Sequence, residues 1–383
     1  MSRLVMVFLI DALGYEQARD PAFLPSLTTP RAPVRSVLGY SSACIPSLLT
    51  GQLPETHGHL SMYRRAPKEG GVFSGIAPWV SIAAKLTGRQ WMLRQWISSH
   101  LRRSGITGYF SLYDVPLPLL RHFDLVQRRN VYAPGAFETV EGLPDLLARR
   151  GVPHRIWDWT VSEEAAFADL ERTVETGSER VLFFYRPELD GLMHTVGPND
   201  PRVGRTLSEY SARIEAIVAK ARERHDEVEV YAFGDHGMAQ VDHTHDLWEP
   251  LRALPLRVPD DYLYFLDSTM ARFWFRTDEA RRTVRGLLKT LDFGRILEIS
   301  ELQELGAFYR DQEYGEMIFL LNEGHILVPS FMGLSPVRGM HGYHPDASAS
   351  YTTLLTNRPP SSYPTSLLEV HRLLSESFAR ASA

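Results

Sequence analysis

Cysteine is almost absent from the chain, because Cys44 is the only one among 383 residues. A single cysteine can form neither an intramolecular disulfide nor a cysteine-rich metal site. Long apolar runs are missing too: none approaches the ~20 residues that a membrane-spanning helix needs, and the apolar start of the chain ends at Asp11. We therefore expect a soluble protein of a reducing compartment, the cytoplasm, with no membrane partner.

An excess of positive charge is also lacking. The 46 acidic residues outnumber the 41 basic ones, which gives a formal net charge of −5. Without an overall positive field, we expect no nucleic-acid polymer as a partner. The chain has 44% apolar, 23% charged and 11% aromatic residues, values that exclude fibrous and disordered classes.

Three apolar runs predict buried parallel strands. Residues 5–10, 181–185 and 228–233 are β-branched or aromatic in large part, and each is followed by a polar stretch that contains an aspartate. Between the last two, apolar residues recur every three or four positions from Leu207 to Ala221, as in an amphipathic helix. Strand, helix and strand form a right-handed crossover. The sequence thus predicts an α/β fold, with a mainly parallel central sheet and helices on both faces.

Two stretches interrupt this alternation. Residues from about 62 to 140 are rich in aromatic residues without a clear order of strands and helices, which favours a lid or an insertion. The pattern of residues 251–335 predicts two strands, a helix and two further strands. This order is typical of a small α+β cap. We assign residues 1–250 and 336–383 to the catalytic domain, with the aromatic stretch inserted in it, and expect the cap to pack over the rim of the sheet.

Carboxylates and imidazoles follow the predicted strands. Asp190 and His194 stand four residues apart, so one helical turn would bring them to the same face. Ligands bind beyond the carboxyl ends of parallel strands, so such residues should meet at one rim. Three aspartates and three histidines form a mixed set of nitrogen and oxygen donors that suits zinc, with enough ligands for two ions. The six candidates are Asp11, Asp190, His194, Asp235, His236 and His341.

A hydroxyl-rich segment, residues 39–51, supplies candidate nucleophiles. Its serines stand just before a predicted short helix, where free backbone N–H groups favour anions. Two adjacent zinc ions can activate an attacking oxygen and steady a leaving oxygen in phosphoryl displacement. Ser41 and Ser42 are the neighbouring candidates for the attacking group.

Five short motifs follow one another along the chain. They are LIDALG from Leu9, TGQLPETHG from Thr50, DGLMHTVGP from Asp190, DHGM from Asp235 and GMHGY from Gly339. In sequence and order they resemble the type I phosphodiesterase/nucleotide pyrophosphatase branch of the alkaline phosphatase superfamily. The resemblance implies a zinc-dependent hydrolase of phosphate esters, most of all of phosphodiesters or nucleotide pyrophosphates, which works through a covalent phospho- or nucleotidyl-serine.

The resemblance also implies a role for each site residue. One zinc would be held by Asp190, His194 and His341, and the other by Asp11, Asp235 and His236. In the family the nucleophile lies ten residues before the glycine of the Thr-Gly pair, which selects Ser41 here, in contact with the metal, with Ser42 as the alternate. The expected partner is a small phosphate ester.

Some features depart from the family pattern or leave alternatives open. Cys44 stands where relatives carry an asparagine that holds a phosphate oxygen, so that donor must come from elsewhere. Pro46 prefers the first turn of a helix, which favours a helix start beyond Ser41. His344 is an alternative to His341 as the metal ligand of the fifth motif.

Two other enzyme classes are alternatives. A phosphomonoesterase could use the same two zinc ions. A sulfatase is a weaker alternative, because Cys44 stands three residues too late relative to the Thr-Gly pair and Leu48 replaces the usual arginine.

Overall fold

The fold is described from a computed structural model, in which residues 3–75 and 90–381 are described. The chain forms two compact units. Unit 1 comprises Met1–Leu53, Tyr132–Val241 and Val337–Ala383, and unit 2 comprises Pro54–Val131 and Asp242–Pro336. Most of the aromatic stretch therefore folds with the segment expected to be a cap, whereas we had assigned it to the catalytic domain as an insertion.

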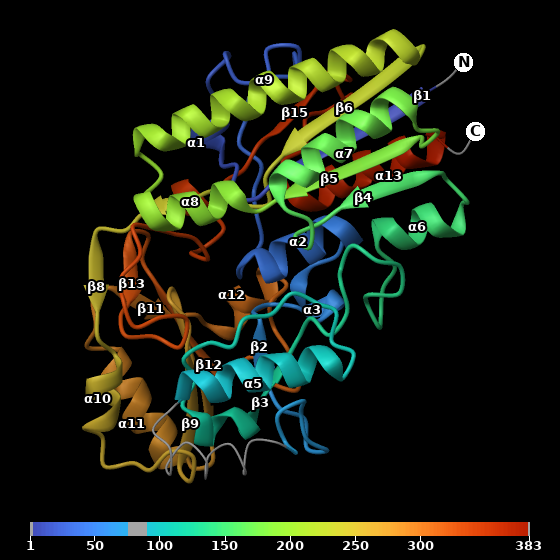
Figure 1. The fold of residues 1–383 in the computed structure, drawn as a ribbon. Helices are drawn as coiled ribbons and strands as arrows, with labels where there is room; N and C mark the ends of the chain where they lie inside the picture. Colours follow the sequence, from blue (N-terminus) through green and yellow to red (C-terminus); the bar gives the residue numbers. More distant parts are fainter. Residues whose placement is uncertain (1–2, 76–89, 382–383) are drawn as a thin grey trace. The chain divides into compact units, whose positions relative to one another are not determined.

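Unit 1 is built on a five-stranded sheet in the order β15-β6-β1-β5-β4 (Figure 1). Its strands are β1 (Arg3–Ile10), β4 (His154–Trp157), β5 (Val181–Arg186), β6 (Glu227–Phe233) and β15 (Leu354–Thr356). All neighbours pair in parallel except β15, which runs antiparallel to β6. The predicted α/β fold with a mainly parallel sheet is confirmed.

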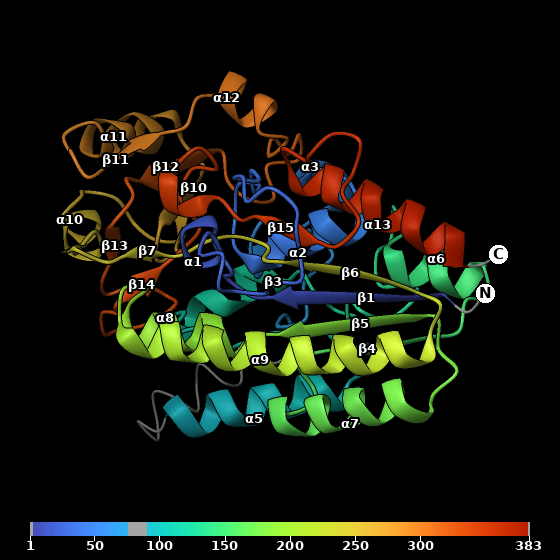
Figure 2. The ribbon, with the colours of Figure 1, turned by 90° about the horizontal axis from the view of Figure 1, so that it is seen from above.

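Helices cover both faces of this sheet (Figure 2). On one face lie α7 (Glu163–Thr176) and α9 (Pro201–Arg224), whose apolar sides join alternate β1 residues, such as Met6 and Phe8, in one buried cluster. On the other lie α2 (Ser41–Thr50), α6 (Leu143–Arg149) and α13 (Leu367–Ala381), and α13 packs on both β1 and α2. The sheet is thus buried from both sides, which explains why its strands read as continuous apolar runs.

Short elements at the carboxyl end of the sheet bring distant motifs together. Helix α8 (Glu188–Val196) follows β5, and β7 (Ala239–Gln240), just after β6, pairs antiparallel with β14 (Gly339–Met340). A further short helix, α1 (Tyr15–Ala18), follows β1. The pairing of β7 with β14 places the fifth motif beside the fourth, about a hundred residues away in the chain.

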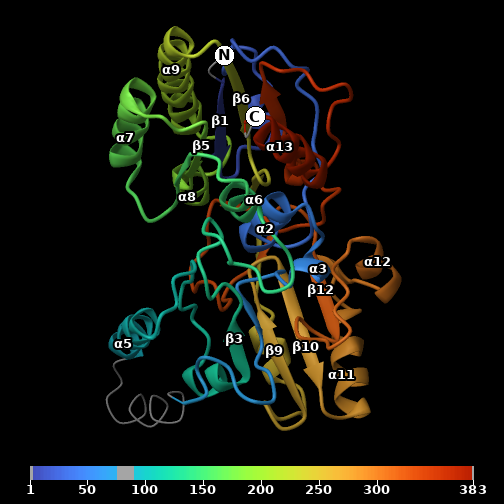
Figure 3. The ribbon, with the colours of Figure 1, turned by 90° about the vertical axis from the view of Figure 1, so that its right-hand side faces the viewer.

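Unit 2 is built on an antiparallel sheet in the order β11-β12-β10-β9 (Figure 3). The strands are β9 (Tyr262–Leu266), β10 (Met270–Phe275), β11 (Gly294–Ile296) and β12 (Met317–Leu321). Helix α11 (Asp278–Leu288) buries Ala280, Val284 and Leu288 in the core of this unit. This core is rich in aromatic rings, among them Phe123 and Phe265, whose centroids are 4.9 Å apart.

The rest of unit 2 consists of short elements. Two small ladders join β2 (Tyr63–Arg65) to β3 (Phe123–Leu125) and β8 (His243–His245) to β13 (His325–Leu327). The other helices among the described residues of unit 2 are α3 (Pro54–His57), α5 (Gln90–Arg103), the 3-10 helix η1 (Leu117–His122), α10 (Trp248–Arg252) and α12 (Ile299–Glu304). Among the described residues of the chain, no helix is long and apolar enough to cross a membrane.

Candidate active site

Ser41 is the first residue of α2, so its side chain stands at the amino end of a helix. Pro46 lies inside this helix, and the expectation that it delays the helix start is therefore wrong. Eight of the ten residues of α2, from Ala43 to Thr50, are buried. Tertiary packing of α2 thus outweighs the local preference of proline for a first turn.

A first group of candidate ligands, the inner group, comprises Asp11, Asp235 and His236 at the carboxyl ends of β1 and β6. All three side chains are buried. His236 Nε2 lies 3.3 Å from Asp235 Oδ2 and 3.5 Å from Asp11 Oδ1. Adjacent parallel strands therefore deliver these residues to one point, as the sequence predicts.

Glycine lets the backbone close tightly around the inner group. A Cβ added at Gly234 would lie 2.4 Å from the carbonyl oxygen of Leu13, and one at Gly237 would lie 2.4 Å from that of Ala349. Real Cβ atoms do not approach other atoms so closely, so a side chain at either position would push the strand-end loop away. Close packing of the backbone thus explains why glycine stands on each side of Asp235-His236.

A second group, the outer group, comprises Asp190, His194 and His341. Asp190 and His194 lie one turn apart on α8, with His194 Nε2 3.3 Å from Asp190 Oδ2. His341 follows β14, and its Nε2 lies 3.5 Å from Asp190 Oδ1. A Cβ at Gly339 would lie 2.6 Å from the Met193 carbonyl oxygen, so glycine there allows β14 to approach α8.

The two groups are neighbours. The rings of His236 and His341 stack with centroids 3.8 Å apart and an interplanar angle of 12°. Within each group, the candidate ligand atoms lie within 4.8 Å of one another. The six residues therefore fall into the two sets of three that the family resemblance implies. His344 belongs to neither group, and its Nδ1 accepts a hydrogen bond from the backbone N–H of Asp346.

Backbone carbonyls orient two of the imidazoles. His236 Nδ1 donates to the carbonyl oxygen of Gly237 at 2.9 Å, and His194 Nδ1 donates to that of Gly339 at 2.8 Å. A carbonyl can only accept, so Nδ1 carries a proton in both rings and Nε2 faces the carboxylates. Metal-binding histidines are held in this way by their other ring nitrogen.

The donor set of the inner group fits a cation. Asp235 Oδ2 is buried and makes no hydrogen bond with any described residue, although His236 Nε2 is 3.3 Å away. A carboxylate oxygen and an imidazole nitrogen thus lie side by side in a buried place, an arrangement that a metal ion between them would stabilise. In the outer group, Asp190 Oδ1 is also buried without a hydrogen bond to any described residue, and His341 Nε2 lies 3.5 Å from it.

The electrostatics of the two groups differ. Burial, reinforced by the charges of Asp235 and Asp190, raises the pKa of Asp11 well above its usual value, and burial raises the pKa of Asp235 to about 7. For Asp190, the charge of His194 and its hydrogen bond outweigh burial, so its pKa lies below its usual range. Burial would lower the pKa of His194, but the Asp190 carboxylate raises it to about 9.

Ser41 contacts the inner group. Its hydroxyl donates a hydrogen bond to His236 Nε2 at 2.9 Å, and its Oγ lies 3.5 Å from Asp11 Oδ1. Ser42 Oγ, by contrast, is buried and makes no hydrogen bond with any described residue. Cys44 Sγ is buried, 3.2 Å from Ser36 Oγ, so it does not take the place of a phosphate-holding amide.

Tyr185 is a site residue that the sequence analysis missed. Its hydroxyl donates to Asp11 Oδ2 at 2.6 Å, because β5 pairs with β1 in a register that sets Tyr185 opposite Leu9. In the sequence it reads as one more aromatic residue of a buried strand, and no motif includes it. Only the pairing of the strands reveals the contact.

The sequence and the fold place the chain among known proteins. A family model for type I phosphodiesterases/nucleotide pyrophosphatases matches residues 33–286. The chain belongs to this family. The resemblance of the five motifs to the type I phosphodiesterase/nucleotide pyrophosphatase branch is thereby confirmed. No curated protein matches the sequence.

Solved structures of ectonucleotide pyrophosphatase/phosphodiesterase 5 share the fold of this phosphodiesterase family member. The human protein has a TM-score of 0.66 at 14% identity, over 98% of this chain and 95% of that one. The murine protein has a TM-score of 0.66 at 15% identity, over 98% of this chain and 95% of that one. An inactive variant of the murine protein in complex with AMP also has a TM-score of 0.66 at 15% identity, over 99% and 95%.

Proposed function

We propose that the protein is a zinc-dependent phosphodiesterase or nucleotide pyrophosphatase in which Ser41 is the nucleophile. The observation that carries this proposal is the position of the Ser41 hydroxyl, at the first residue of α2 and 2.9 Å from His236 Nε2. A hydroxyl at a helix amino end and beside buried metal ligands combines the two features that activate a serine and attract a phosphate.

Two zinc ions would be held by the residues of the two groups. Asp11, Asp235 and His236, together with Ser41, would hold one ion, and Asp190, His194 and His341 the other. Bound there, zinc supplies positive charge that lowers the pKa of a hydroxyl and offsets the charge of phosphate oxygens. The mixed nitrogen and oxygen donors support zinc over calcium or magnesium, which prefer oxygen alone.

Hydrolysis would proceed in two displacements at phosphorus. Ser41 Oγ forms a bond to phosphorus and loses its proton to solvent, while the bond from phosphorus to the leaving oxygen breaks and that oxygen takes up a proton. Water then attacks phosphorus, the Oγ–phosphorus bond breaks, and Ser41 regains its proton. The intermediate is a phospho- or nucleotidyl-serine.

The amino end of α2 would hold the phosphate oxygens in place of the missing asparagine. The helix carries free N–H groups in its first turn, and these include those of Ser41 and Ser42. Ser42 Oγ, which makes no hydrogen bond with a described residue, is a further donor at this end. A nucleotide substrate is supported by the AMP complex of the inactive murine relative.

A substrate panel with zinc tests this function. We expect hydrolysis of bis-nitrophenyl phosphate and of thymidine nitrophenyl phosphate to exceed that of nitrophenyl phosphate, and no hydrolysis of nitrophenyl sulfate. If nitrophenyl phosphate were hydrolysed faster, the protein would instead be a phosphomonoesterase that uses the same residues. Rapid-quench mass spectrometry should find the phosphoryl or nucleotidyl adduct on the peptide that contains Ser41.

A further inference from the structure

Unit 2 contains a cavity of about 680 Å³, which we call the basic pocket. It is lined by residues 64–69, 121, 122, 259, 263, 274–276, 311 and 313, all of them in unit 2. The six candidate metal ligands and Ser41 all belong to unit 1. The basic pocket is therefore assembled from other residues than the candidate active site.

Backbone hydrogen bonds hold the walls of the basic pocket together. The N–H of Arg65 donates to the carbonyl of Glu313, and that of Ala66 donates to the carbonyl of His122, both at 2.8 Å. Strand β2 also pairs with β3 next to His122, with Arg65 opposite Phe123. The backbone positions of Arg65 and His122 are thus fixed by the pairing of β2 with β3 and by these two hydrogen bonds.

Cationic side chains predominate around the basic pocket. The charged residues that line it are Arg64, Arg65, Lys68, Arg121 and Arg276 against Glu69, Asp311 and Glu313. Arg64 is already balanced, because its Nη1 lies 2.9 Å from Glu313 Oε2 and its Nη2 lies 3.6 Å from Asp124 Oδ2. The four other cations therefore face only two further carboxylates.

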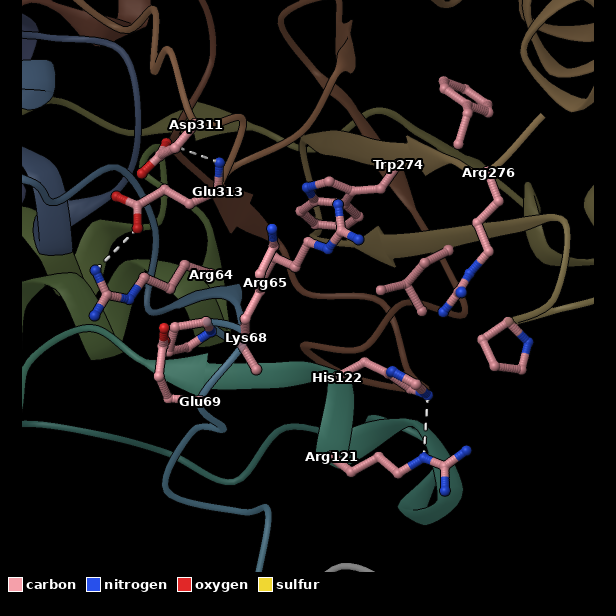
Figure 4. A pocket seen from close by; sticks show the side chains of 15 residues that line it. Arg64, Arg65, Lys68, Glu69, Arg121, His122, Trp274, Arg276, Asp311 and Glu313 are labelled. Atoms are coloured by element: carbon pink, nitrogen blue, oxygen red, sulfur yellow. Dashed lines mark hydrogen bonds and ion pairs between the residues drawn. The ribbon is translucent and has the colours of Figure 1, made fainter. Parts of the chain in front are cut away.

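Three of those cations have no partner in the described part of the chain. The side chains of Arg65, Lys68 and Arg276 make no hydrogen bond or ion pair with any described residue. Figure 4 shows Arg65, Arg276 and His122 on one side of the basic pocket, whereas Glu313 and Asp311 lie on the other. The chain as a whole is acidic, with a formal net charge of −5, so this positive charge is a local feature.

His122 lines the same pocket and is influenced by the charges of its arginines. Partial burial lowers its pKa, and the charges of Arg121, Arg276 and Arg65 lower the pKa further. Arg121 Nε also lies 3.2 Å from His122 Nε2. Positive charge from three segments of the chain thus acts on one imidazole.

We propose that the basic pocket binds a small molecule that carries two or more negative charges on phosphate groups. Guanidinium groups match phosphate with paired N–H donors, and several of them together select a multiply charged ligand. The volume of the cavity is in the range of small-molecule sites. Pro259, Leu263 and Phe275 add apolar surface, against which the organic part of such a ligand can pack.

Chemical labelling of arginine tests this proposal on the intact wild-type protein. Phenylglyoxal reacts with accessible guanidinium groups, and peptide mass spectrometry reports each arginine separately. We expect inorganic pyrophosphate to slow the labelling of Arg65, Arg121 and Arg276 by several-fold. Arg282 is the internal control, because it is exposed on α11 and does not line the basic pocket.

Binding measurements on variants give a second readout. We expect Arg65→Ala and Arg276→Ala each to weaken pyrophosphate binding at this site at least ten-fold by calorimetry, and Arg282→Ala to leave it unchanged. All three side chains are exposed, so these variants should fold. Neither the labelling nor the calorimetry measures hydrolysis. A negative result for the basic pocket can therefore be distinguished from a failure of the proposed hydrolase function.

Several results would overturn the proposal. Equal labelling of the three pocket arginines with and without pyrophosphate would show that no phosphate ligand binds there. Equal protection by citrate would refute selection of phosphate over carboxylate. Protection by an oligonucleotide but not by pyrophosphate would replace the small molecule with a nucleic acid.

Discussion

The inner and outer groups of the candidate active site balance their charges in different ways. In the inner group, two buried carboxylates face one imidazole, and burial raises the pKa of both Asp11 and Asp235. In the outer group, Asp190 and His194 form their own ion pair, which lowers the pKa of the acid and raises that of the base. A cation that binds the inner group would therefore displace protons from carboxyl groups, whereas one that binds the outer group would displace a proton from the imidazole of His194.

The largest expected effect concerns Ser41, which touches the inner group. Ser41→Ala should lower turnover by about 10³-fold or more with metal content unchanged, because the covalent step is lost. Ser42→Ala is the matched control and should cost on the order of ten-fold, the effect of one hydrogen bond of about 1–1.5 kcal/mol. Steady-state kinetics with bis-nitrophenyl phosphate measure both. The reverse order of severity, or a trapped adduct on Ser42, would refute the assignment.

Tyr185 supports only the inner group, through its hydrogen bond to Asp11 Oδ2. Loss of such a supporting partner typically weakens metal affinity roughly 10–100-fold. Tyr185→Phe should therefore weaken one of the two zinc sites by that amount, as followed by competition with a zinc chelator. The other zinc site should keep its affinity. Equal weakening of both sites would contradict the separation into two groups.

In metal-free protein, asparagine variants of the inner and outer groups should change the melting temperature in different ways. Asp235→Asn removes a buried negative charge and should leave the melting temperature unchanged or raise it by a few degrees. Asp190→Asn leaves His194 without its ion-pair partner and should lower the melting temperature by several degrees. Differential scanning fluorimetry in EDTA distinguishes the two. A similar loss in both variants would mean that the charge balance of the groups does not differ.

The pH dependence of metal-free stability should show the same contrast. The folded-state pKa of Asp235, about 7, is above its usual 3.8, so folding favours its protonated form and stability falls as the pH rises from about 4 to 7. The pKa of His194, about 9, is above its usual 6.5, so its contribution is complete below pH 6.5 and is lost as the pH rises through 9.

The stability that Asp235 and His194 contribute to the metal-free protein should thus decrease as the pH rises from 5 to 9. Melting curves across this range should show that Asp235→Asn removes the part of the decrease below pH 7, and that Asp190→Asn removes the part above it. Melting temperatures of both variants that change with pH in parallel with that of the wild type in EDTA would contradict both pKa directions.

The parallel sheet was the most predictable part of the fold. The apolar runs at 5–10, 181–185 and 228–233 became β1, β5 and β6 with ends shifted by at most two residues. The edge strands were missed. β4 is only partly buried and includes His154 and Arg155, and β15 has three residues, so neither has the long apolar run that marks a central strand.

The candidate site was predictable where short motifs carry it. The six candidate ligands come from strand ends and one helical turn, and such local patterns can be recognised in the sequence. Two features were not predictable. The start of α2 depends on burial of the helix rather than on Pro46, and the contact of Tyr185 depends on the register between strands.

Metal content tests the central claim most directly. We expect elemental analysis of the purified protein to find about two zinc ions per chain. Asp235→Ala and Asp190→Ala should each retain about one ion, because each substitution removes a ligand from only one group. Less than one ion per chain in the wild type, or two ions in both variants, would contradict the assignment of the two groups as metal sites.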